Sequence, residues 1–446
     1  MRDLLVVLPV VLCALVALRK PWIGVMCWNW LSLMNPHRYT YGFAYDAPLA
    51  ALAAVSTMVG FLVTREKGSP FKGTPMAWMA IFMVWITLSW LFGIDRVGDQ
   101  EQWSKVMKID IMILIGMALL HSRLHIMMLC WVSAGSLALL GAKGGLFTIA
   151  TGGSERVWGP PGSFIADNNE FALSMVMTIP LLRFLQMQLQ PGWRRHAMTL
   201  MMLLCGAAAL GSQSRGALLA ISAMLVVLWW RGGSRLMGGV LMLVAGAALV
   251  VFMPDTWSER MSTIQTYQED RSAMGRISAW WVAWGIGKNH LLGIGFDAAR
   301  AELFQMYSPH PDYVHAAHSI YFQVMGNHGL IGLFIFLAIF VSAYFWAGKL
   351  RKEGLVDERA RWVVDLGAMA QVSLIGYAVG GAFLSLAYFD LPYIVMMMVV
   401  LARVWVRKRA WETEPALDTK WARWLGVAWP PPPAAAPPEP ARRAAA

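Results

Sequence analysis

The sequence predicts an all-α polytopic integral membrane protein with about 12 transmembrane helices and one long outer loop that contains short amphipathic helices. Three observations support this prediction. Of the 446 residues, 58% are hydrophobic and only 14% are charged, whereas soluble domains are about half apolar and a quarter charged. Apolar runs long enough to cross a bilayer recur through most of the chain. Short segments rich in Lys and Arg separate these runs, as in proteins that cross the membrane many times.

A helix needs about 20 apolar residues to cross the hydrocarbon core of a bilayer. Candidate spans occupy residues 3–18, 21–35, 46–64, 75–93, 105–120, 124–147, 169–187, 197–213, 216–230, 236–253, 329–348, 363–386 and 389–405. The first two are short enough to form a shallow hairpin, and we therefore expect about 12 spans. The four cysteines lie inside apolar runs without metal-ligand spacing, which argues against a disulfide framework or a zinc site.

The basic segments predict how the helices are oriented. If the spans alternate in direction, one side of the membrane receives the basic segments 19–20, 65–67, 122–123, 193–195, 231–235, 349–352 and 403–409. This side is cytoplasmic by the positive-inside rule. The other side is then periplasmic in a bacterium, and it receives residues 36–45, 94–104, 148–168, 211–216, the long loop and 388–390. The net charge of +11 therefore reflects membrane orientation, and we expect no nucleic-acid partner. Residues 1–18 lack a small-residue cleavage site, so we expect no cleavable signal peptide.

We expect four regions along the chain. Residues 1–253 form about ten transmembrane helices, and residues 329–405 form the C-terminal ones. Between them, residues 254–328 form a periplasmic loop that holds five of the nine histidines. Polar titratable groups are costly at membrane depth and are kept where they function, so this loop is where we expect chemistry. Residues 406–446 are expected to form a Pro/Ala-rich cytoplasmic tail of low complexity, without a core.

The long loop is predicted to be ordered. Its tryptophans at positions 280, 281 and 284 follow helical spacing, which indicates an interfacial amphipathic helix that begins near Ser272. Gly293 and Gly295 mark a turn, and residues 298–306 favour a second short helix. Residues 307–313 are broken by two prolines. We expect the tryptophans to anchor the helix at the interface more than to bind sugar.

Three polar side chains are predicted to converge on the periplasmic side. Arg215 lies in a Gly- and Ser-rich interruption between two spans, where an unwound backbone can line a cavity. Arg276 opens the aromatic helix of the long loop, and His318 lies just before the span expected at Gly329. Each residue also has a structural interpretation. Arg215 could be a loop arginine that reaches lipid headgroups, Arg276 a surface arginine on the helix, and His318 a structural histidine.

Four stretches in this order resemble the O-antigen ligase and polymerase family. They are residues 156–172 (Arg-Val-Trp-Gly-Pro-Pro-Gly-Ser-Phe-Ile-Ala-Asp-Asn-Asn-Glu-Phe-Ala), 212–217 (Ser-Gln-Ser-Arg-Gly-Ala), Arg276 with Trp280 to Trp284 and 289–295 (Asn-His-Leu-Leu-Gly-Ile-Gly), and 318–321 (His-Ser-Ile-Tyr) with Gly329. The resemblance covers about residues 150–345. Residues 22–24 and 35–46 are similar to the subgroup of putative O-glycosylation ligases associated with exosortase systems.

The resemblance implies a GT-C-like enzyme of the bacterial inner membrane whose active site faces the periplasm. Such an enzyme moves a glycan from undecaprenyl pyrophosphate to a hydroxyl of lipid A-core or of a protein, among membrane lipids. It implies that His318 is the general base and that Arg215 and Arg276 bind the pyrophosphate, without metal or other cofactor and with inversion at the sugar carbon. Arg156 and Asn169 are secondary candidates for donor or acceptor binding, with loop hydrogen bonding as the alternative. Tyr321 is a third secondary candidate. It follows His318 by three residues, so on one helix the two side chains would share a face.

Three other hypotheses remain open. His310, Asp312, His315 and His318 could form a zinc or manganese site, which insensitivity to a chelator would exclude. A transporter of lipid-linked glycans would also use broken helices with an arginine, but it predicts two repeated halves that the sequence does not show. A polymerase would use a second carrier-linked glycan as acceptor, and the sequence does not separate it from a ligase.

Overall fold

The computed structural model describes residues 2–231 and 271–429, and the regular structure of this part is helical apart from an isolated bridge between Leu417 and Trp429. The all-α prediction is thus confirmed for these residues. The predicted span 236–253 and the start of the long loop lie outside them. In chain order the α-helices are α1 (Arg2–Ala17), α2 (Pro21–Met34), α3 (Leu49–Val63), α4 (Thr74–Leu91), α5 (Gln100–Leu119), α6 (Arg123–Ala150), α7 (Asn168–Gln188), α8 (Trp193–Gly211), α9 (Arg215–Arg231), α12 (Arg271–Asn289), α13 (Ala301–Tyr307), α14 (Ile320–Glu353), α15 (Trp362–Gly381), α16 (Asp390–Arg407) and α17 (Lys420–Leu425).

Several of these helices have the length and apolar composition of membrane spans. Within the described residues, five do: Thr74–Leu91, Arg123–Ala150, Asn168–Gln188, Ile320–Glu353 and Glu358–Gly381. Leu49–Val63 and Arg215–Trp230 are apolar but shorter. Large apolar side chains also point outward, with Leu5 of α1, Leu62 of α3 and Phe334 of α14 each more than 60% exposed. Such faces suit contact with lipid and support a membrane protein, while the count of about 12 spans stays a prediction.

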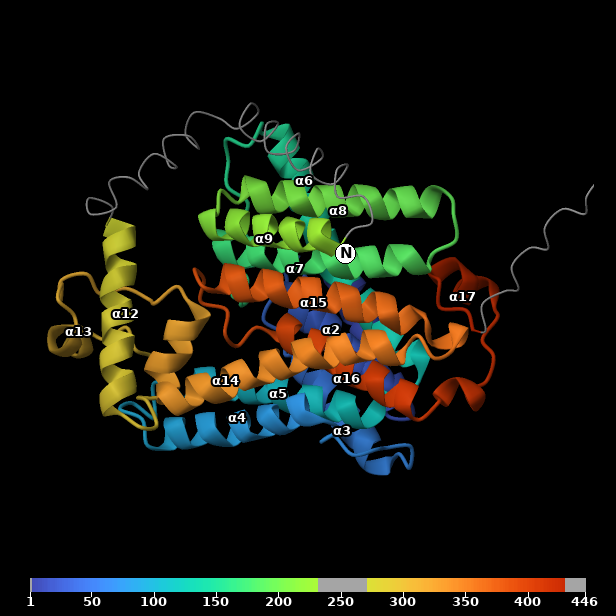
Figure 1. Ribbon diagram of the computed structural model, residues 1–446, viewed down its shortest axis with the longest axis horizontal. Helices are drawn as coiled ribbons and strands as arrows, with labels where there is room; N and C mark the ends of the chain where they lie inside the picture. Colours follow the sequence, from blue (N-terminus) through green and yellow to red (C-terminus); the bar gives the residue numbers. More distant parts are fainter. Residues whose placement is uncertain (1, 232–270, 430–446) are drawn as a thin grey trace, which may run out of the picture.

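The helices run back and forth between two ends of an elongated bundle (Figure 1). We call one end the basic end; it comprises residues 64–73, 120–122, 189–192, 354–361 and 408–429. The helix ends that border these segments are joined there: Arg123 Nη1 of α6 donates to the Val427 carbonyl at 2.8 Å, and Gln188 Nε2 of α7 donates to the Asp365 carboxylate of α15 at 3.3 Å. We call the other the loop end; it comprises residues 92–99, 151–167, 212–214, 290–319 and 382–389. There Asn168 Nδ2 donates to the Ser212 carbonyl at 2.7 Å. The basic and the polar loops thus lie at opposite ends, as alternating spans require.

The segment after α16 departs from the expectation of a tail without a core. It folds back on the basic end, where Trp411 and Trp429 are 6% and 5% exposed. Their rings lie 5.5 and 5.7 Å from that of Trp405 in α16, measured between centroids. The expectation is therefore wrong up to Trp429, because the tryptophans bury against α16; residues 430–446 lie outside the described part.

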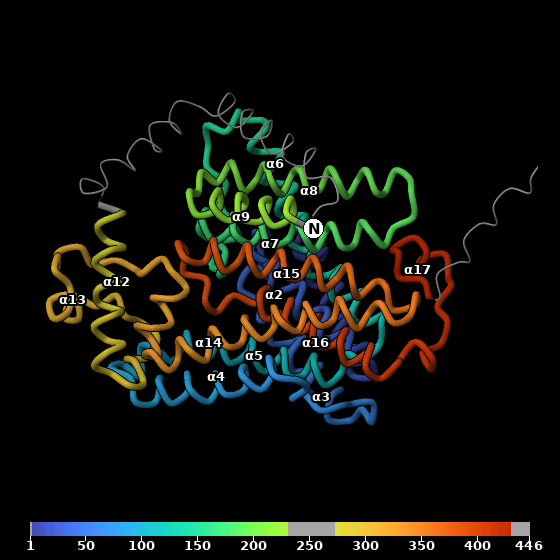
Figure 2. Tube along the Cα trace, viewed as in Figure 1, coloured from blue at the N-terminus to red at the C-terminus, as the bar shows by residue number. Residues whose placement is uncertain are grey.

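The long loop contains the predicted helices. α12 crosses the loop end at a steep angle to the bundle helices, with α13 beside it (Figures 1 and 2). α12 confirms the helix predicted near Ser272, and α13 confirms the one predicted over residues 298–306. α14 begins at Ile320, upstream of the span start expected at Gly329, and its backbone is non-helical at Gly329.

Gly329 joins two helical pieces of α14 where only glycine fits. Its φ is 72° and its ψ is −179°, a combination almost restricted to glycine. A Cβ on Gly329 would also lie 2.5 Å from the Leu291 carbonyl oxygen. The preceding residue, His328, is fully buried and bonds Ser89 Oγ at 2.9 Å and the Tyr388 hydroxyl at 2.7 Å. This network ties α14 to α4 and to the turn before α16, so it fixes the start of α14 at the loop end.

Candidate functional site

The turn between α15 and α16 brings three helix starts together at the loop end. On α9, a Cβ added to Gly216 would lie 3.2 Å from Phe383 Cβ of this turn. On α7, the Glu170 carboxyl accepts a hydrogen bond from the Ser385 backbone N–H. On α14, Gln323 Oε1 accepts from a backbone N–H of the turn at 3.3 Å. The first residues of α7, α9 and α14, which are far apart in sequence, therefore border one small region.

α12 positions the segment that precedes α14. Its Gly275 lies so close to His315 that an added Cβ would be 3.1 Å from His315 Cβ. One turn later, the Trp280 ring stacks on Phe322 of α14 at 4.9 Å between centroids. Trp280 Nε1 also donates to the Ala317 carbonyl at 2.8 Å. These contacts hold the segment against the face of α12 that starts at Arg276.

His318 lies between these anchors with an unusual backbone. Its φ is 41°, which is uncommon for a residue with a side chain and often marks a functional site. Burial lowers the pKa of His318 to about 4, and the positive charges of Arg276 and His315 act in the same direction. Asp167 opposes them and raises the pKa. His318 is therefore neutral at pH 7, and among the described residues its buried Nδ1 has no hydrogen-bond partner.

Asp167 and Glu170 form an acidic pair at the start of α7. Asp167 Oδ1 accepts from the Asn169 backbone N–H and from Asn169 Nδ2, both at 2.9 Å. Burial would raise the pKa of Asp167, but hydrogen bonds from Glu170 and Asn169 and an electrostatic interaction with His318 lower it. Two carboxyls in one hydrogen bond share a proton, and we assign it to the more buried Glu170. Asp167 then carries the negative charge that faces His318.

The secondary candidates Arg156 and Asn169 lie in the same region. Arg156 Nε donates to Gln213 Oε1 at 3.4 Å, and Gln213 Nε2 in turn donates to the Gly153 carbonyl at 3.1 Å. Residues 151–167 are thereby fastened to the interruption before Arg215. The Asn169 amide is committed to Asp167 and to Asn168 Oδ1. Loop hydrogen bonding, the alternative named for both residues, is present, and a role in ligand binding stays a prediction.

The expectation that His318 and Tyr321 share a helix face is wrong. α14 begins at Ile320, so His318 precedes the helix and its left-handed backbone turns it away from helical spacing. The Tyr321 hydroxyl instead donates to the Ala378 carbonyl of α15 at 2.7 Å. Tyr321 thus joins α14 to α15 beside the site, and its contact with a ligand stays a prediction.

The histidines of the long loop do not assemble as the metal-site hypothesis requires. Across residues 2–231 and 271–429, no three His, Cys, Asp or Glu side chains form a group able to hold a metal ion. The His315 and His318 rings lie 4.9 Å apart between centroids, but His310 packs against Tyr313 instead. His315 and His318 therefore act as neighbours within the site, without the rest of the proposed ligand set.

Two cavities flank the site. One, of about 130 Å³, lies between α12 and the start of α14 and is lined by His315, Gln323 and Ser385 among others. The second, of about 360 Å³, is an apolar groove between α14 and α15 that begins at Ile320 and Tyr321. The cavity, which is lined by alanine and phenylalanine as well as by polar side chains, and the apolar groove thus lie next to the segment that carries His318.

The sequence prediction missed Asp167, Glu170 and Gln323 as members of this region, and it named His315 only as a possible metal ligand. Asp167 and Glu170 stand in the Asp-Asn-Asn-Glu run, where an acid at the start of a predicted helix is ordinarily a cap. The spacing of two acids in one first turn could have indicated a pair. Gln323 carried no such signal, because only the fold places the turn after α15 against it.

Comparison with known protein families gives two matches. Residues 200–337 match a family model described as O-Antigen ligase, which confirms the resemblance to that family. This match includes Arg215, Arg276 and His318. Residues 1–190 match a model described as a family of unknown function, DUF5935. A comparison with curated proteins found no match.

Proposed function

We propose that this protein transfers a glycan from undecaprenyl pyrophosphate to an acceptor hydroxyl on the periplasmic side of a bacterial inner membrane. The observation that carries the proposal is that Arg276 lies close enough to His318 at the loop end to lower its pKa, while Gly216, next to Arg215, packs against the turn between α15 and α16. A neutral imidazole and guanidinium groups are the groups that deprotonate a hydroxyl and bind a pyrophosphate. The match to the O-antigen ligase model supports glycan transfer of this kind.

In the proposed reaction, His318 is the general base. The acceptor oxygen forms a bond to C1 of the sugar while the bond from C1 to the pyrophosphate oxygen breaks, and the hydroxyl proton moves to His318. A single displacement of this kind inverts C1. The bound pyrophosphate brings negative charge near His318, which raises the pKa of its imidazole toward the working pH. Asp167 favours the imidazolium that forms in the same way.

Arg215 and Arg276 are proposed to bind the pyrophosphate and to offset the charge that grows on it as the bond breaks. Guanidinium groups do this with paired, charge-assisted hydrogen bonds. Loss of one donor of this type costs about 3–4 kcal/mol of transition-state stabilisation. The pyrophosphate is a good leaving group and the arginines supply the positive charge, so the proposed reaction uses no metal or other cofactor.

The apolar groove between α14 and α15 is proposed to hold the first isoprene units of the carrier. It begins beside His318 at Ile320 and Tyr321 and continues along Phe340 and Tyr344. A polyprenyl chain requires an apolar surface that remains open to the bilayer. The acceptor, which is lipid A-core or a protein hydroxyl, would then enter from the periplasm.

The test is a transfer assay with purified full-length protein in lipid nanodiscs, a carrier-linked glycan and a candidate acceptor. His318→Ala, Arg276→Ala and Arg215→Ala are each expected to lower the rate at least about a hundredfold. His310→Ala and Arg96→Ala change exposed residues of the loop end and serve as matched controls. They should retain wild-type turnover, and so should wild-type protein treated with a chelator.

Several results would contradict the proposal. Wild-type turnover by His318→Ala would remove His318 as the base, and loss of activity on chelation would revive the metal hypothesis. Transport of the donor across the bilayer without transfer would favour a transporter. Products that carry two donor glycans on one carrier would assign a polymerase of the same family.

A further inference from the structure

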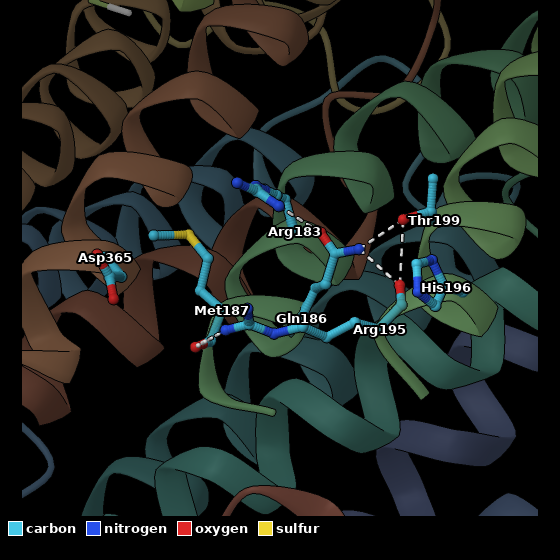
Figure 3. A pocket seen from close by; sticks show the side chains of 7 residues that line it. All are labelled: Arg183, Gln186, Met187, Arg195, His196, Thr199 and Asp365. Atoms are coloured by element: carbon cyan, nitrogen blue, oxygen red, sulfur yellow. Dashed lines mark hydrogen bonds between the residues drawn. The ribbon is translucent and has the colours of Figure 1, made fainter. Parts of the chain in front are cut away.

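A pocket lined mostly by polar side chains lies at the basic end, at the opposite end of the bundle from His318. It has a volume of about 370 Å³ and lies between the end of α7, the first turns of α8 and the start of α15. Figure 3 shows its side chains, which include Arg183, Arg195 and His196. None of the glycan-transfer chemistry above uses these residues.

A buried glutamine fixes the arrangement of this pocket. Gln186 is 5% exposed, and its Nε2 donates to the Arg195 carbonyl at 2.7 Å and to Thr199 Oγ1 at 2.6 Å (Figure 3). Its Oε1 accepts a hydrogen bond from Arg183 Nη1. The Gln186 Nε2 thereby joins α7 to α8, while Oε1 holds Arg183 of α7 at the edge of the pocket.

Both guanidinium groups keep donors that the described residues do not use. Arg195 donates from Nε to the Leu189 carbonyl at 2.9 Å and from Nη2 to the Met187 carbonyl at 3.5 Å. Arg183 forms its bond to Gln186 through Nη1. Within residues 2–231 and 271–429 neither arginine forms a salt bridge, although Asp365 lines the same pocket. Two arginines and one carboxylate leave a net charge of +1 before His196 is counted.

The surroundings place this charge at a lipid surface. α7 is a candidate membrane span that ends at Gln188, so the pocket lies where the helices leave the bilayer. On α8, His196 is followed at helical spacing by Leu200 and Leu203, which are 56% and 66% exposed. The polar pocket therefore continues into an exposed apolar strip that runs toward the hydrocarbon region.

We infer that this pocket binds the phosphate of an anionic membrane lipid, whose acyl chain lies along Leu200 and Leu203. A phosphodiester accepts paired hydrogen bonds from guanidinium groups and offsets the excess positive charge. The positive end of the α8 dipole adds to this attraction. Basic pockets between membrane helices bind anionic headgroups in this way. A soluble phosphate would satisfy the arginines but would leave the apolar strip without a role.

The test measures lipid binding to the purified full-length protein by native mass spectrometry. Phosphatidylglycerol is the anionic probe, phosphatidylcholine the zwitterionic one, and inorganic phosphate the soluble one. We expect phosphatidylglycerol to bind more tightly than phosphatidylcholine. Arg183→Gln should weaken it about tenfold, because one charge-assisted contact is lost. Arg65→Gln makes the same change at an exposed position of the basic end outside the pocket, and it should bind as wild type does.

A second variant separates the two sources of phosphate. Leu203→Gln should weaken phosphatidylglycerol without changing any response to inorganic phosphate, because it alters only the apolar strip. Displacement of the lipid by millimolar inorganic phosphate would overturn the assignment to a lipid. Equal binding of both lipids, or wild-type binding by Arg183→Gln, would overturn the site itself. Each variant is compared at an unchanged unfolding temperature, so that a folding defect is recognised, and glycan transfer is not part of the readout.

Discussion

At the scale of single residues, the candidate base is surrounded by opposing charges. Burial, Arg276 and His315 lower the pKa of His318, while Asp167 raises it. The sequence identified His318 and Arg276 through their motifs, but it did not identify Asp167 as their neighbour. Asp167 precedes His318 by about 150 positions, and no helical or strand periodicity connects residues so distant. Only the packing of α7 against α15, which in turn packs against α14, brings them into one region.

The first prediction concerns the pH dependence of the proposed reaction. A base must be unprotonated, so kcat/KM of wild-type protein should rise with pH through a pKa near 4, well below the ordinary 6.5 of histidine. Asp167→Asn removes the charge that raises the pKa of His318, so this rise of kcat/KM, the acid limb of the profile, should move to lower pH. The plateau rate should fall about tenfold, because the imidazolium of the transition state loses a negative neighbour. The measurement is the pH profile of initial transfer rates.

Asp167 also caps α7, and the choice of asparagine separates this role from its charge. Asn caps a helix as well as Asp does, so the unfolding temperature of Asp167→Asn should match wild type. Glu155→Gln removes an exposed acid from the same loop, and it should change neither the pH of the acid limb nor the plateau rate. An acid limb that stays at the wild-type pH in Asp167→Asn would show that Asp167 does not act on His318.

At the scale of elements, the loop end depends on two breaks in helical structure. The glycines at 293 and 295 predicted a turn, and both have positive φ there. The break in α14 at Gly329 was predicted only as the start of a span, because an apolar run does not show where its first turn begins. The helical pattern around Trp280 predicted α12 itself. It did not predict that Trp280 would stack on Phe322, because a contact across elements is invisible to periodicity.

The second prediction tests the break in α14. Gly329→Ala places a side chain in a conformation nearly exclusive to glycine, which costs about 1–3 kcal/mol in the backbone alone. Its Cβ would also meet the Leu291 carbonyl oxygen at 2.5 Å, so the 290–293 turn must move. We expect a clearly lower unfolding temperature and slower transfer. Thermal unfolding in one detergent, together with the transfer assay, measures both.

A glycine inside α8 provides the matched control. A Cβ on Gly206 would meet nothing within 4 Å. Alanine is favoured over glycine in a helix by about 0.5–1 kcal/mol, so Gly206→Ala should unfold at the same or a higher temperature. If Gly329→Ala were as stable as Gly206→Ala, the break would not be required by the fold.

At the scale of the whole molecule, the alternation of basic and polar loops was the strongest sequence prediction. It placed residues 148–168, the interruption at 211–216 and the long loop on one side. Hydrogen bonds join the first two segments, and Asp167 interacts electrostatically with His318 of the long loop. The alternation placed Arg123 and residues 193–195 on the other side, where they meet the returning chain near Trp424 and Val427. That return was not predicted, because the charged residues around the buried tryptophans resemble a solvated tail.

The last prediction tests which end faces the periplasm, on which the proposed function depends. Asp312 is exposed at the loop end and Lys67 is exposed at the basic end. Three native cysteines are buried and Cys13 is half-buried, so wild-type protein supplies the background for a thiol reagent. Because Lys and Arg are retained on the cytoplasmic side, a membrane-impermeant maleimide should label Asp312→Cys in intact spheroplasts. It should label Lys67→Cys only after permeabilisation. The reverse result would place His318 toward the cytoplasm, where a donor carried in the outer leaflet could not reach it, and the proposed transfer would fail.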